Sequence, residues 1–341
     1  MRIALDAMGG DHAPSTTVEG AVEAVKRFKG LSVILVGDKT KLSSELRGKE
    51  YPHSHISIKH TSETVDMDES PISAMRRKKD SSIRVAIDLV KSGEADAVVS
   101  AGNSGVVMAT ALYVLGKLKG VERPAIATVM PKVEGRFVLI DAGANVDCKP
   151  VHLLQFAVMG AAYAKHIFNV KDPRIALLGI GEEDVKGNEL TKETFKGLRN
   201  LQKNFIGNIE GKDIFSGEAD VVVCDGFVGN IALKISEGMA EATTKMLKQE
   251  ISQTAYGKLG YLLLKSAFKN FKKKIDYSEY GGAPLLGISK LCIIGHGRST
   301  ARAIRNAIKL AYEFHDKKVL EALSHEFNVN MLEREQLVAK R

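Results

Sequence analysis

The sequence predicts an α/β fold whose sheet is mainly parallel and covered by helices on both faces. Short apolar runs recur along the 341 residues, and each is followed by a turn of small polar residues and then by a helical pattern. This alternation is typical of parallel strands that are buried on both faces. One pair of runs differs, because residues 125–130 and 136–140 are separated by only five residues. Five residues are too few for a helical crossover, so we expect an antiparallel hairpin within a mixed sheet.

The expected strands follow one another along the chain, and each ends in a turn that could carry a ligand. The first strand, residues 2–5, leads through a Gly-rich turn into a helix over residues 16–28. In open sheets of this type, ligands bind beyond the carboxyl ends of the strands. We therefore expect the polar turns to converge on one site. Later strands are expected at 32–36, 95–99, 125–130, 136–140, 175–178, 221–223 and 291–294.

Size and composition indicate an ordinary globular protein. No Gly-, Pro- or Ser-rich linker divides the chain, so we expect a single catalytic unit over residues 1–341, with two lobes as the alternative. No apolar run approaches the roughly 20 residues that span a bilayer. The N-terminus enters a strand pattern directly, with no signal peptide ahead of it, and the three cysteines form no C-x-x-C pair. A reduced, cytoplasmic protein is expected.

The net charge of +8 favours an acidic partner, which could be nucleic acid, anionic lipid or an acidic protein. With 6% aromatic residues and no Trp, the sequence offers little for base stacking. Nucleic acid is therefore the least supported of the three partners.

A long helical region at 229–275 is predicted to form a protruding hairpin. Its second part is basic and amphipathic, with lysines opposite an apolar face. Such a helix suits a membrane surface. Packing on a partner subunit is the alternative, and both hold if the hairpin dimerises along its shaft. The residues expected to contact a membrane are Tyr261, Leu264, Phe268 and Phe271.

Several common catalytic motifs do not occur in the sequence. It contains no H-E-x-x-H, no G-x-S-x-G and no G-x-x-x-x-G-K-[ST], and its His and Asp residues do not cluster at metal-ligand spacings. No G-x-G-x-x-G turn follows the first strand, which counts against a dinucleotide enzyme. Metal-dependent hydrolysis, α/β-hydrolase chemistry and P-loop chemistry are therefore not supported.

The remaining candidates are polar turns and lysines that could bind an anion. The turn at 100–105 precedes an apolar helical segment, and the start of a helix exposes N–H groups and partial positive charge. A Gly-rich turn of this kind is as often only a site of tight packing. A basic loop at 76–80 leads into a helix that starts near Ser82, and it is either an anion contact or a solvated surface.

Other residues suggest catalytic roles. Cys148 is a candidate covalent nucleophile, since the neighbouring Lys149 could lower its pKa. His12 and His296 follow glycines at strand ends, where each could act as a general acid or only cap a turn. The other two cysteines, Cys224 and Cys292, lie in strand patterns and are expected in the core.

Several of these motifs together resemble the bacterial phosphate acyltransferase family PlsX. They occur in order along nearly the whole chain, and the combination is specific although each piece is short. They are DAMGGD at 6–11, RRKKDSS at 76–82, SAGNSG at 100–105, DAGAN at 141–145, GEE at 181–183, KGN at 186–188, DGFVGN at 225–230 and YGGAPLLG at 280–287.

The resemblance implies an enzyme that transfers a fatty acyl group from acyl carrier protein to inorganic phosphate, making acyl phosphate for a membrane glycerol-3-phosphate acyltransferase in phospholipid synthesis. It also implies a three-layer α/β/α fold, similar to phosphotransacetylases and the isocitrate dehydrogenase-like group. The resemblance further implies a homodimer that uses no metal or nucleotide cofactor and binds peripherally to the inner face of the cell membrane.

We expect phosphate to attack the thioester carbonyl directly, with the Asp225 carboxylate orienting Lys186 or Lys234. Expected phosphate contacts are Lys79, Ser81, Ser82, Ser100, Gly102, Asn103 and Ser104, expected catalytic residues are Lys186, Asn188, Asp225 and Asn230, and secondary candidates are Asp6, Asp11, His12, Asp141, Asn145, Lys234 and His296. The alternatives are a short-chain phosphate acetyl- or butyryltransferase that uses coenzyme A, an inactive membrane-bound scaffold, and a dehydrogenase of the related fold.

Overall fold

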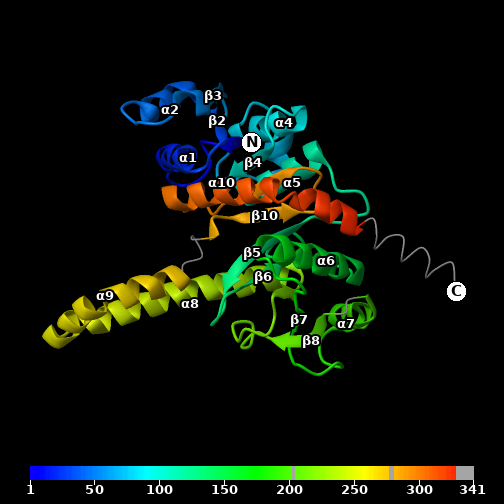
Figure 1. The fold of residues 1–341 in the computed structure, drawn as a ribbon. Coiled ribbons are helices and arrows are strands. Elements are labelled where there is room, and N and C mark those ends of the chain that lie inside the picture. Colours follow the sequence, from blue (N-terminus) through cyan, green and yellow to red (C-terminus); the bar gives the residue numbers. More distant parts are fainter. Residues whose placement is uncertain (202–203, 276–279, 328–341) are drawn as a thin grey trace.

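One mixed sheet runs through the molecule, and helices cover both of its faces (Figure 1). The computed structural model describes residues 1–201, 204–275 and 280–327. The described strands are β1 (Arg2–Asp6), β2 (Ser32–Gly37), β3 (Ile56–His60), β4 (Ala97–Ser100), β5 (Ala125–Pro131), β6 (Arg136–Ile140), β7 (Ile175–Gly179), β8 (Phe205–Glu210), β9 (Val221–Val223), β10 (Ala283–Leu286) and β11 (Leu291–Ile294).

The described helices connect these strands in the expected alternation. They are α1 (Ser15–Arg27), α2 (Lys39–Leu46), α3 (Pro71–Arg77), α4 (Ser82–Ser92), α5 (Ser104–Leu115), α6 (Pro150–Ile167), α7 (Glu189–Leu201), α8 (Gly226–Ser252), α9 (Ala255–Ile275) and α10 (Ala301–Asp316), and residues 319–327 are also helical.

The strand order is β3-β2-β1-β4-β11-β10-β5-β6-β9-β7-β8. All pairs on either side of the centre are parallel, whereas β10 pairs antiparallel with both neighbours and β5 pairs antiparallel with β6. The predicted antiparallel hairpin of β5 and β6 is confirmed, with Ala127 opposite Ile140. The two parallel groups therefore run in opposite directions, and their carboxyl ends belong to two sets of turns rather than one.

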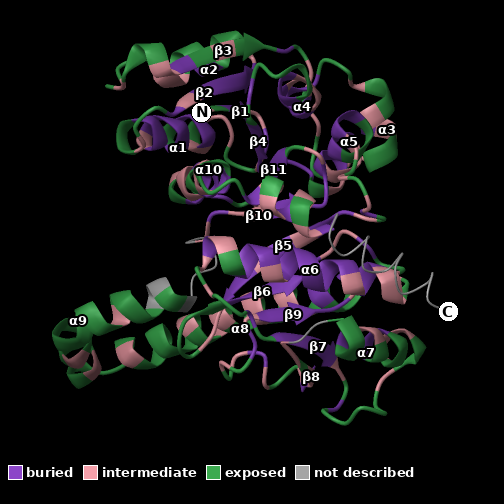
Figure 2. Cartoon of the chain, turned by 45° about the vertical axis from the view of Figure 1, so that its right-hand side comes forward, coloured by how far each residue is buried: buried purple, intermediate pink, exposed green. Residues whose placement is uncertain are grey.

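Alternate residues of the strands face two separate layers of helices. In β1, Ile3 and Leu5 belong to a core shared with α1, α6 and α10, whereas Ala4 belongs to a core shared with α4 and α5. In β6, Leu139 faces a third cluster, against which Leu233 of α8 packs. Figure 2 shows the buried residues concentrated in the strands and α6. This arrangement confirms the three-layer α/β/α architecture with a mixed, mostly parallel sheet.

The sequence did not reveal three of the strands. β3 and β8 lie at the two edges of the sheet, and each has only one buried residue, so neither has the continuous apolar run that marks a buried strand. β10 (four residues) carries Pro284, and a proline within a run argues against a strand because it cannot donate a ladder hydrogen bond. The basic loop expected at 76–80 was also partly wrong, because Arg76 and Arg77 form the end of α3, a short helix that begins with Pro71.

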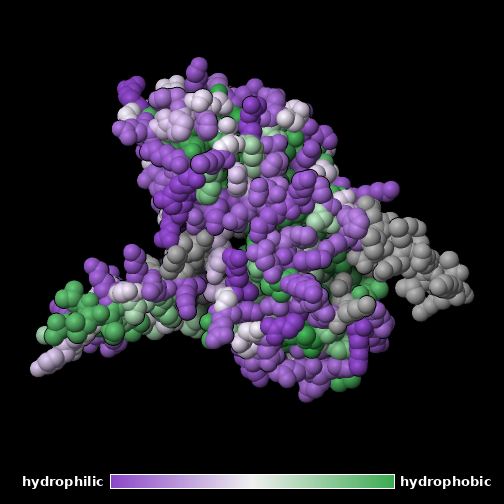
Figure 3. All heavy atoms as spheres, viewed as in Figure 1, coloured by the Kyte–Doolittle hydropathy of each residue, from purple (hydrophilic) through white to green (hydrophobic). Residues whose placement is uncertain are grey.

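Helices α8 and α9 leave the body of the molecule as a protruding hairpin, as predicted (Figure 1). Apolar side chains gather near its far end (Figure 3), where Tyr256 is 88% and Leu263 is 78% exposed. Of the four expected membrane contacts, Tyr261, Leu264 and Phe271 are exposed, whereas Phe268 is half-buried with its ring 5.2 Å from that of Tyr261. Within the described residues, no helix has both the length and the apolar character needed to cross a bilayer.

Candidate active site

A buried aspartate organises the turn after β1. The carboxylate of Asp6 accepts a hydrogen bond from Ser100 Oγ at 2.6 Å, and Ser82 at the start of α4 also bonds to it. Burial raises the pKa of Asp6, and these hydrogen bonds oppose the shift. A Cβ atom at Gly9 would lie 2.7 Å from the backbone nitrogen of Gly102, so only glycine allows the turns after β1 and β4 to pack this closely. Asp6 thus joins β1, β4 and α4.

The turn after β4, which the sequence predicts to hold phosphate, uses most of its polar groups internally. The N–H of Gly102 donates to Ser100 Oγ at 3.1 Å, and Asn103 Oδ1 caps α5. The amide group of Asn103 donates to backbone oxygens of the 66–69 loop at 2.9 and 3.0 Å. These three residues therefore build the turn, and Ser104 alone among its predicted contacts lines a described pocket.

In the basic segment before α4, the serines also have structural partners, and the lysine is exposed. Ser81 is buried, caps α4, and donates to the backbone oxygen of Lys78 at 2.8 Å. Lys79 is exposed, and no described pocket includes it. The hydroxyls of Ser81 and Ser82 thus already have structural partners. Phosphate contacts from these two serines and from Lys79 stay predictions.

A second buried aspartate organises the turn after β6. Asp141 accepts hydrogen bonds from the backbone N–H groups of Ile126, Gly143 and Ala144 on Oδ1, at 3.0 to 3.2 Å. Its Oδ2 accepts from both the backbone and the side chain of Asn145, at 2.7 and 2.8 Å. Burial raises the pKa of Asp141, whereas the donors favour its ionised form. The predicted candidates Asp141 and Asn145 thus hold the turn together.

The start of α8 is locked against this turn. Asp225 is the N-cap, and its side chain accepts a hydrogen bond from the N–H of Val228 at 2.9 Å. A Cβ atom at Gly229 would lie 1.9 Å from the backbone oxygen of Asp141, so glycine is required there. This close contact fixes the direction of the first turns of α8, which carry Asn230 and Lys234.

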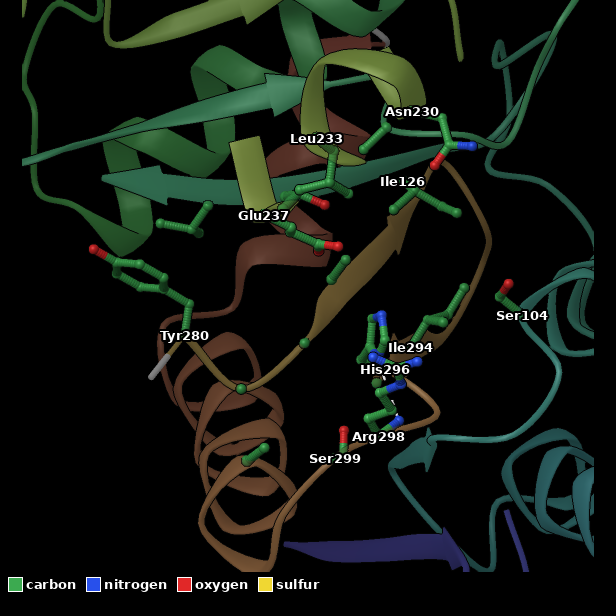
Figure 4. Close-up of a pocket in the computed structure, with 18 of the residues that line it drawn as sticks. Ser104, Ile126, Asn230, Leu233, Glu237, Tyr280, Ile294, His296, Arg298 and Ser299 are labelled. Carbon is green, nitrogen blue, oxygen red and sulfur yellow. Dashed lines mark hydrogen bonds between the residues drawn. The ribbon is translucent and has the colours of Figure 1, made fainter. Parts of the chain in front are cut away.

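A polar pocket of about 220 Å³ lies between the start of α8 and the turn that follows β11 (Figure 4). Residues of β5 and β10 also line it. Its side chains come from turns that follow strands of both parallel groups, so the expected convergence is realised for some of the turns. The polar residues on which the site depends are Ser104, Asn230, Lys234, Glu237, His296 and Arg298, and Thr128, Tyr280 and Ser299 also line it.

Hydrogen-bond donors converge in the polar pocket. His296 Nδ1 accepts a hydrogen bond from the backbone N–H of Arg298 at 3.2 Å, so in the neutral ring Nε2 carries the hydrogen. That Nε2 lies 3.3 Å from the Lys234 ammonium nitrogen, which is also a donor. Burial, and then the charge of Lys234, lower the pKa of His296. Two donors this close together favour an anion beside them that both can contact.

Glu237 and Arg298 were missed by the sequence reasoning. Glu237 accepts a hydrogen bond from Lys234 at 2.8 Å, so Glu237 rather than Asp225 orients this lysine. Arg298 is exposed at the pocket and follows His296 by two residues. A search of the charged residues near the two secondary candidates would have found both. Glu237 lies one helical turn after Lys234, and Arg298 lies in the same turn as His296.

Several other candidates lie outside the polar pocket. Lys186 belongs to the exposed loop after β7, and Asn188 accepts hydrogen bonds from Thr191 at the start of α7. Asp11 and His12 are exposed, although the backbone N–H of Asp11 donates to Gly297 beside the pocket at 2.8 Å. The catalytic roles of Lys186 and Asn188 stay predictions. Across the described part of the chain, no cluster of three or more His, Cys, Asp or Glu residues could hold a metal ion.

The expected lowering of the Cys148 pKa by Lys149 was wrong. Burial, followed by the negative charges of Asp141 and Asp225, raises the pKa of Cys148 to about 11. Lys149 does not offset these effects, and the thiol remains protonated at neutral pH. Cys224 and Cys292 are buried in the core, as predicted.

Comparison with known proteins decides the family. A family model described as "Fatty acid synthesis protein" matches residues 1–322. A phosphate acyltransferase from Geobacter sulfurreducens is 56% identical over 324 residues, which cover 95% of this chain and 93% of the relative. A phosphate acyltransferase from Thermodesulfovibrio yellowstonii is 58% identical over 328 residues, which cover 96% of this chain and 94% of the relative. The chain belongs to the phosphate acyltransferase family. This acyltransferase was correctly identified from its turn motifs.

Solved structures agree with the fold of this phosphate acyltransferase. A phosphotransacetylase from Streptococcus pyogenes superposes with a TM-score of 0.58 at 20% identity, over 92% of this chain and 94% of the other. A branched-chain phosphotransacylase from Enterococcus faecalis gives 0.57 at 15% identity, over 92% and 98%. At these identities the likeness concerns the fold alone, and it matches the phosphotransacetylase-like architecture expected from the sequence.

Proposed function

We propose that this acyltransferase moves a fatty acyl group from acyl carrier protein to inorganic phosphate, and that the reaction takes place in the polar pocket. The observation that carries the proposal is the meeting of Lys234, His296 and Arg298 as donors around one small space. Two cations outnumber the one carboxylate, Glu237, and phosphate is anionic at neutral pH. A pocket of this charge positions phosphate and removes part of its water.

In the proposed reaction, a phosphate oxygen attacks the carbonyl carbon of the thioester. A carbon–oxygen bond forms and the carbon–sulfur bond breaks, and the sulfur leaves with the electron pair and takes a proton from water. The leaving thiol has a pKa near that of cysteine, about 8.5, so it needs little assistance. Lys234 and Arg298 hold the phosphate, and the amide of Asn230 donates to the developing oxyanion. The neutral His296 donates through Nε2.

The test compares acyl phosphate formation from palmitoyl-acyl carrier protein and from acetyl-coenzyme A, with phosphate as acceptor. We expect rapid transfer from the carrier protein and a rate at least about tenfold lower from acetyl-coenzyme A. Activity with acetyl-coenzyme A alone would indicate the short-chain alternative. Release of no thiol from either substrate would indicate an inactive scaffold, and a change in nicotinamide absorbance would indicate a dehydrogenase.

The proposed partners follow from charge and shape. Acyl carrier proteins are acidic, which complements the net charge of +8. We further propose a homodimer held by the shaft of the α8–α9 hairpin, in which Ile235 is 64% and Met246 is 66% exposed. The tip of the hairpin would then rest on the inner face of the cell membrane and deliver acyl phosphate to a glycerol-3-phosphate acyltransferase.

Replacing Leu263 and Leu264 together with glutamate should release the protein from vesicles that contain anionic phospholipid. The exposed apolar tip would lose its burial in the lipid, and added negative charge would be repelled by the surface. Co-sedimentation measures the effect, and Ile206→Glu, at an exposed apolar position on β8, serves as the matched control. Equal sedimentation of both proteins would remove the tip from membrane binding.

A further inference from the structure

We propose that an apolar groove beside α8 holds the aliphatic tail of the thioester substrate; this inference rests on the proposed function. The acyl groove, as we call it, has a volume of about 510 Å³ and lies between the α8–α9 hairpin and the turn that joins β5 and β6. Ligand pockets of about 300–1,000 Å³ bury most of a small organic molecule. The side chains that carry the argument are Met130, Val133, Phe215, Met239, Ala240 and Phe271.

Both walls of the acyl groove are apolar, and the wall on the body side is held by its own contacts. On the body side, the N–H of Val133 donates to the backbone oxygen of Phe215 at 3.1 Å, and the Phe215 ring packs edge-on against Phe137. On the hairpin side, Met239 and Phe271 line the groove although both are exposed to solvent. Exposed apolar side chains on two facing walls indicate a surface that an apolar molecule covers.

Three charged residues line the acyl groove, and two of them, Lys132 and Glu237, direct their charges elsewhere, whereas Lys274 lies on α9. The Lys132 ammonium pairs with Asp220 at 3.0 Å and donates to the backbone oxygen of Ala219 at 2.8 Å, so only its stem faces the groove. Glu237 is engaged by Lys234, and the Ser236 hydroxyl donates to the backbone oxygen of Ala232 at 2.7 Å. The groove therefore suits a hydrocarbon chain rather than a polar ligand.

The acyl groove continues from the polar pocket, because Leu233 and Glu237 line both. From there it follows one stripe of α8 through Ala240 to Thr243. Leu233 and Thr243 are ten residues apart, which is about 15 Å along a helix at 1.5 Å per residue. A thioester carbonyl in the polar pocket can thus extend a long chain into the groove, whereas an acetyl group reaches only its mouth.

The first test measures binding without catalysis. The chain contains no Trp, so Met239→Trp places a single indole in the acyl groove, and Glu241→Trp places one at an exposed position outside the groove. Brominated palmitate quenches a Trp that it contacts. We expect saturable quenching of Met239→Trp and no saturable quenching of Glu241→Trp. Equal behaviour of the two variants would overturn the proposal.

The second test measures chain-length selectivity. Each methylene that leaves water strengthens binding about fourfold, so Ala240→Trp, which fills the acyl groove, should lower the ratio of palmitoyl to butyryl transfer from carrier protein at least tenfold. Glu241→Trp should keep the wild-type ratio. An unchanged ratio in Ala240→Trp would overturn the proposal.

The two tests separate this inference from the proposed function. If the wild-type protein transfers neither acyl group to phosphate, the proposed function fails, while quenching of Met239→Trp still reports whether the acyl groove binds a fatty chain. If Ala240→Trp instead sediments as a smaller species and loses both activities equally, the groove is an interface between two copies of the chain, and the inference is overturned.

Discussion

Lys234→Ala is expected to lower kcat/KM for acyl transfer to phosphate by about 100- to 1,000-fold, the usual cost of removing one donor from developing negative charge. Lys234 is the residue on which the polar pocket depends, since it bonds Glu237 at 2.8 Å and lies 3.3 Å from His296. Lys234→Arg should retain more activity than Lys234→Ala, because it keeps the positive charge. It should not reach the wild-type rate, because the guanidinium group differs in geometry from the ammonium group.

The control for this variant is Lys196→Ala, which removes an exposed lysine from α7 outside the described pockets and should keep wild-type activity. Lys186→Ala belongs in the same series, because the sequence predicts a catalytic role for Lys186. A larger loss in Lys186→Ala than in Lys234→Ala would move the reaction from the polar pocket toward the loop after β7.

Lys234→Ala should also change how kcat/KM depends on pH. Protonation of His296 puts a hydrogen on Nδ1, which must accept from the N–H of Arg298, so the neutral ring is required. Burial and then Lys234 lower the pKa of His296 below its usual 6.5. Removing the ammonium should raise this pKa, and the acid limb of kcat/KM should therefore move to higher pH. An acid limb that stays in place would show that His296 does not titrate in the reaction.

The fold was predictable where burial leaves a continuous apolar run, and the site was predictable only in part. The runs that became β1, β4, β9 and β11 have every or nearly every residue buried, and all were recognised. The edge strand β3 carries Lys59 and His60 and could not be told from a loop. Buried strands can be recognised from the sequence because an environment without water on either face accepts few residues other than apolar ones.

Polar turns are harder to interpret, because a buried structural role and a ligand contact use the same residue types. Ser100 and Asn103 have the chemistry of phosphate ligands, yet they bond to Asp6 and to the 66–69 loop. Which partner a hydroxyl or amide finds depends on strand order, and the reversal between β5 and β6 separated turns that the sequence places in one group. Lys234 and His296 meet only through that topology.

Asp141→Asn is expected to destabilise the protein by about 3 kcal/mol or more, although the two side chains have nearly the same shape. The carboxylate accepts from five N–H groups, three on Oδ1 and two on Oδ2. An amide keeps one acceptor oxygen, and its NH₂ group would face the two donors of Asn145. Each of these buried donors then loses its partner, at about 1–3 kcal/mol apiece.

Urea unfolding followed by circular dichroism measures the loss, with Asp225→Asn as the matched control. Asp225 begins α8 as an N-cap, a position where asparagine serves about as well as aspartate, so we expect a change within about 0.5 kcal/mol. The contrast arises because Asp225 uses one acceptor oxygen toward Val228, whereas Asp141 uses both oxygens toward donors alone. Equal unfolding midpoints for the two variants would mean that Asn145 turns its amide and satisfies the new donor. Because Gly229 rests on the backbone of Asp141, the Asp141→Asn variant should also weaken acyl transfer by loosening the start of α8 beneath Lys234.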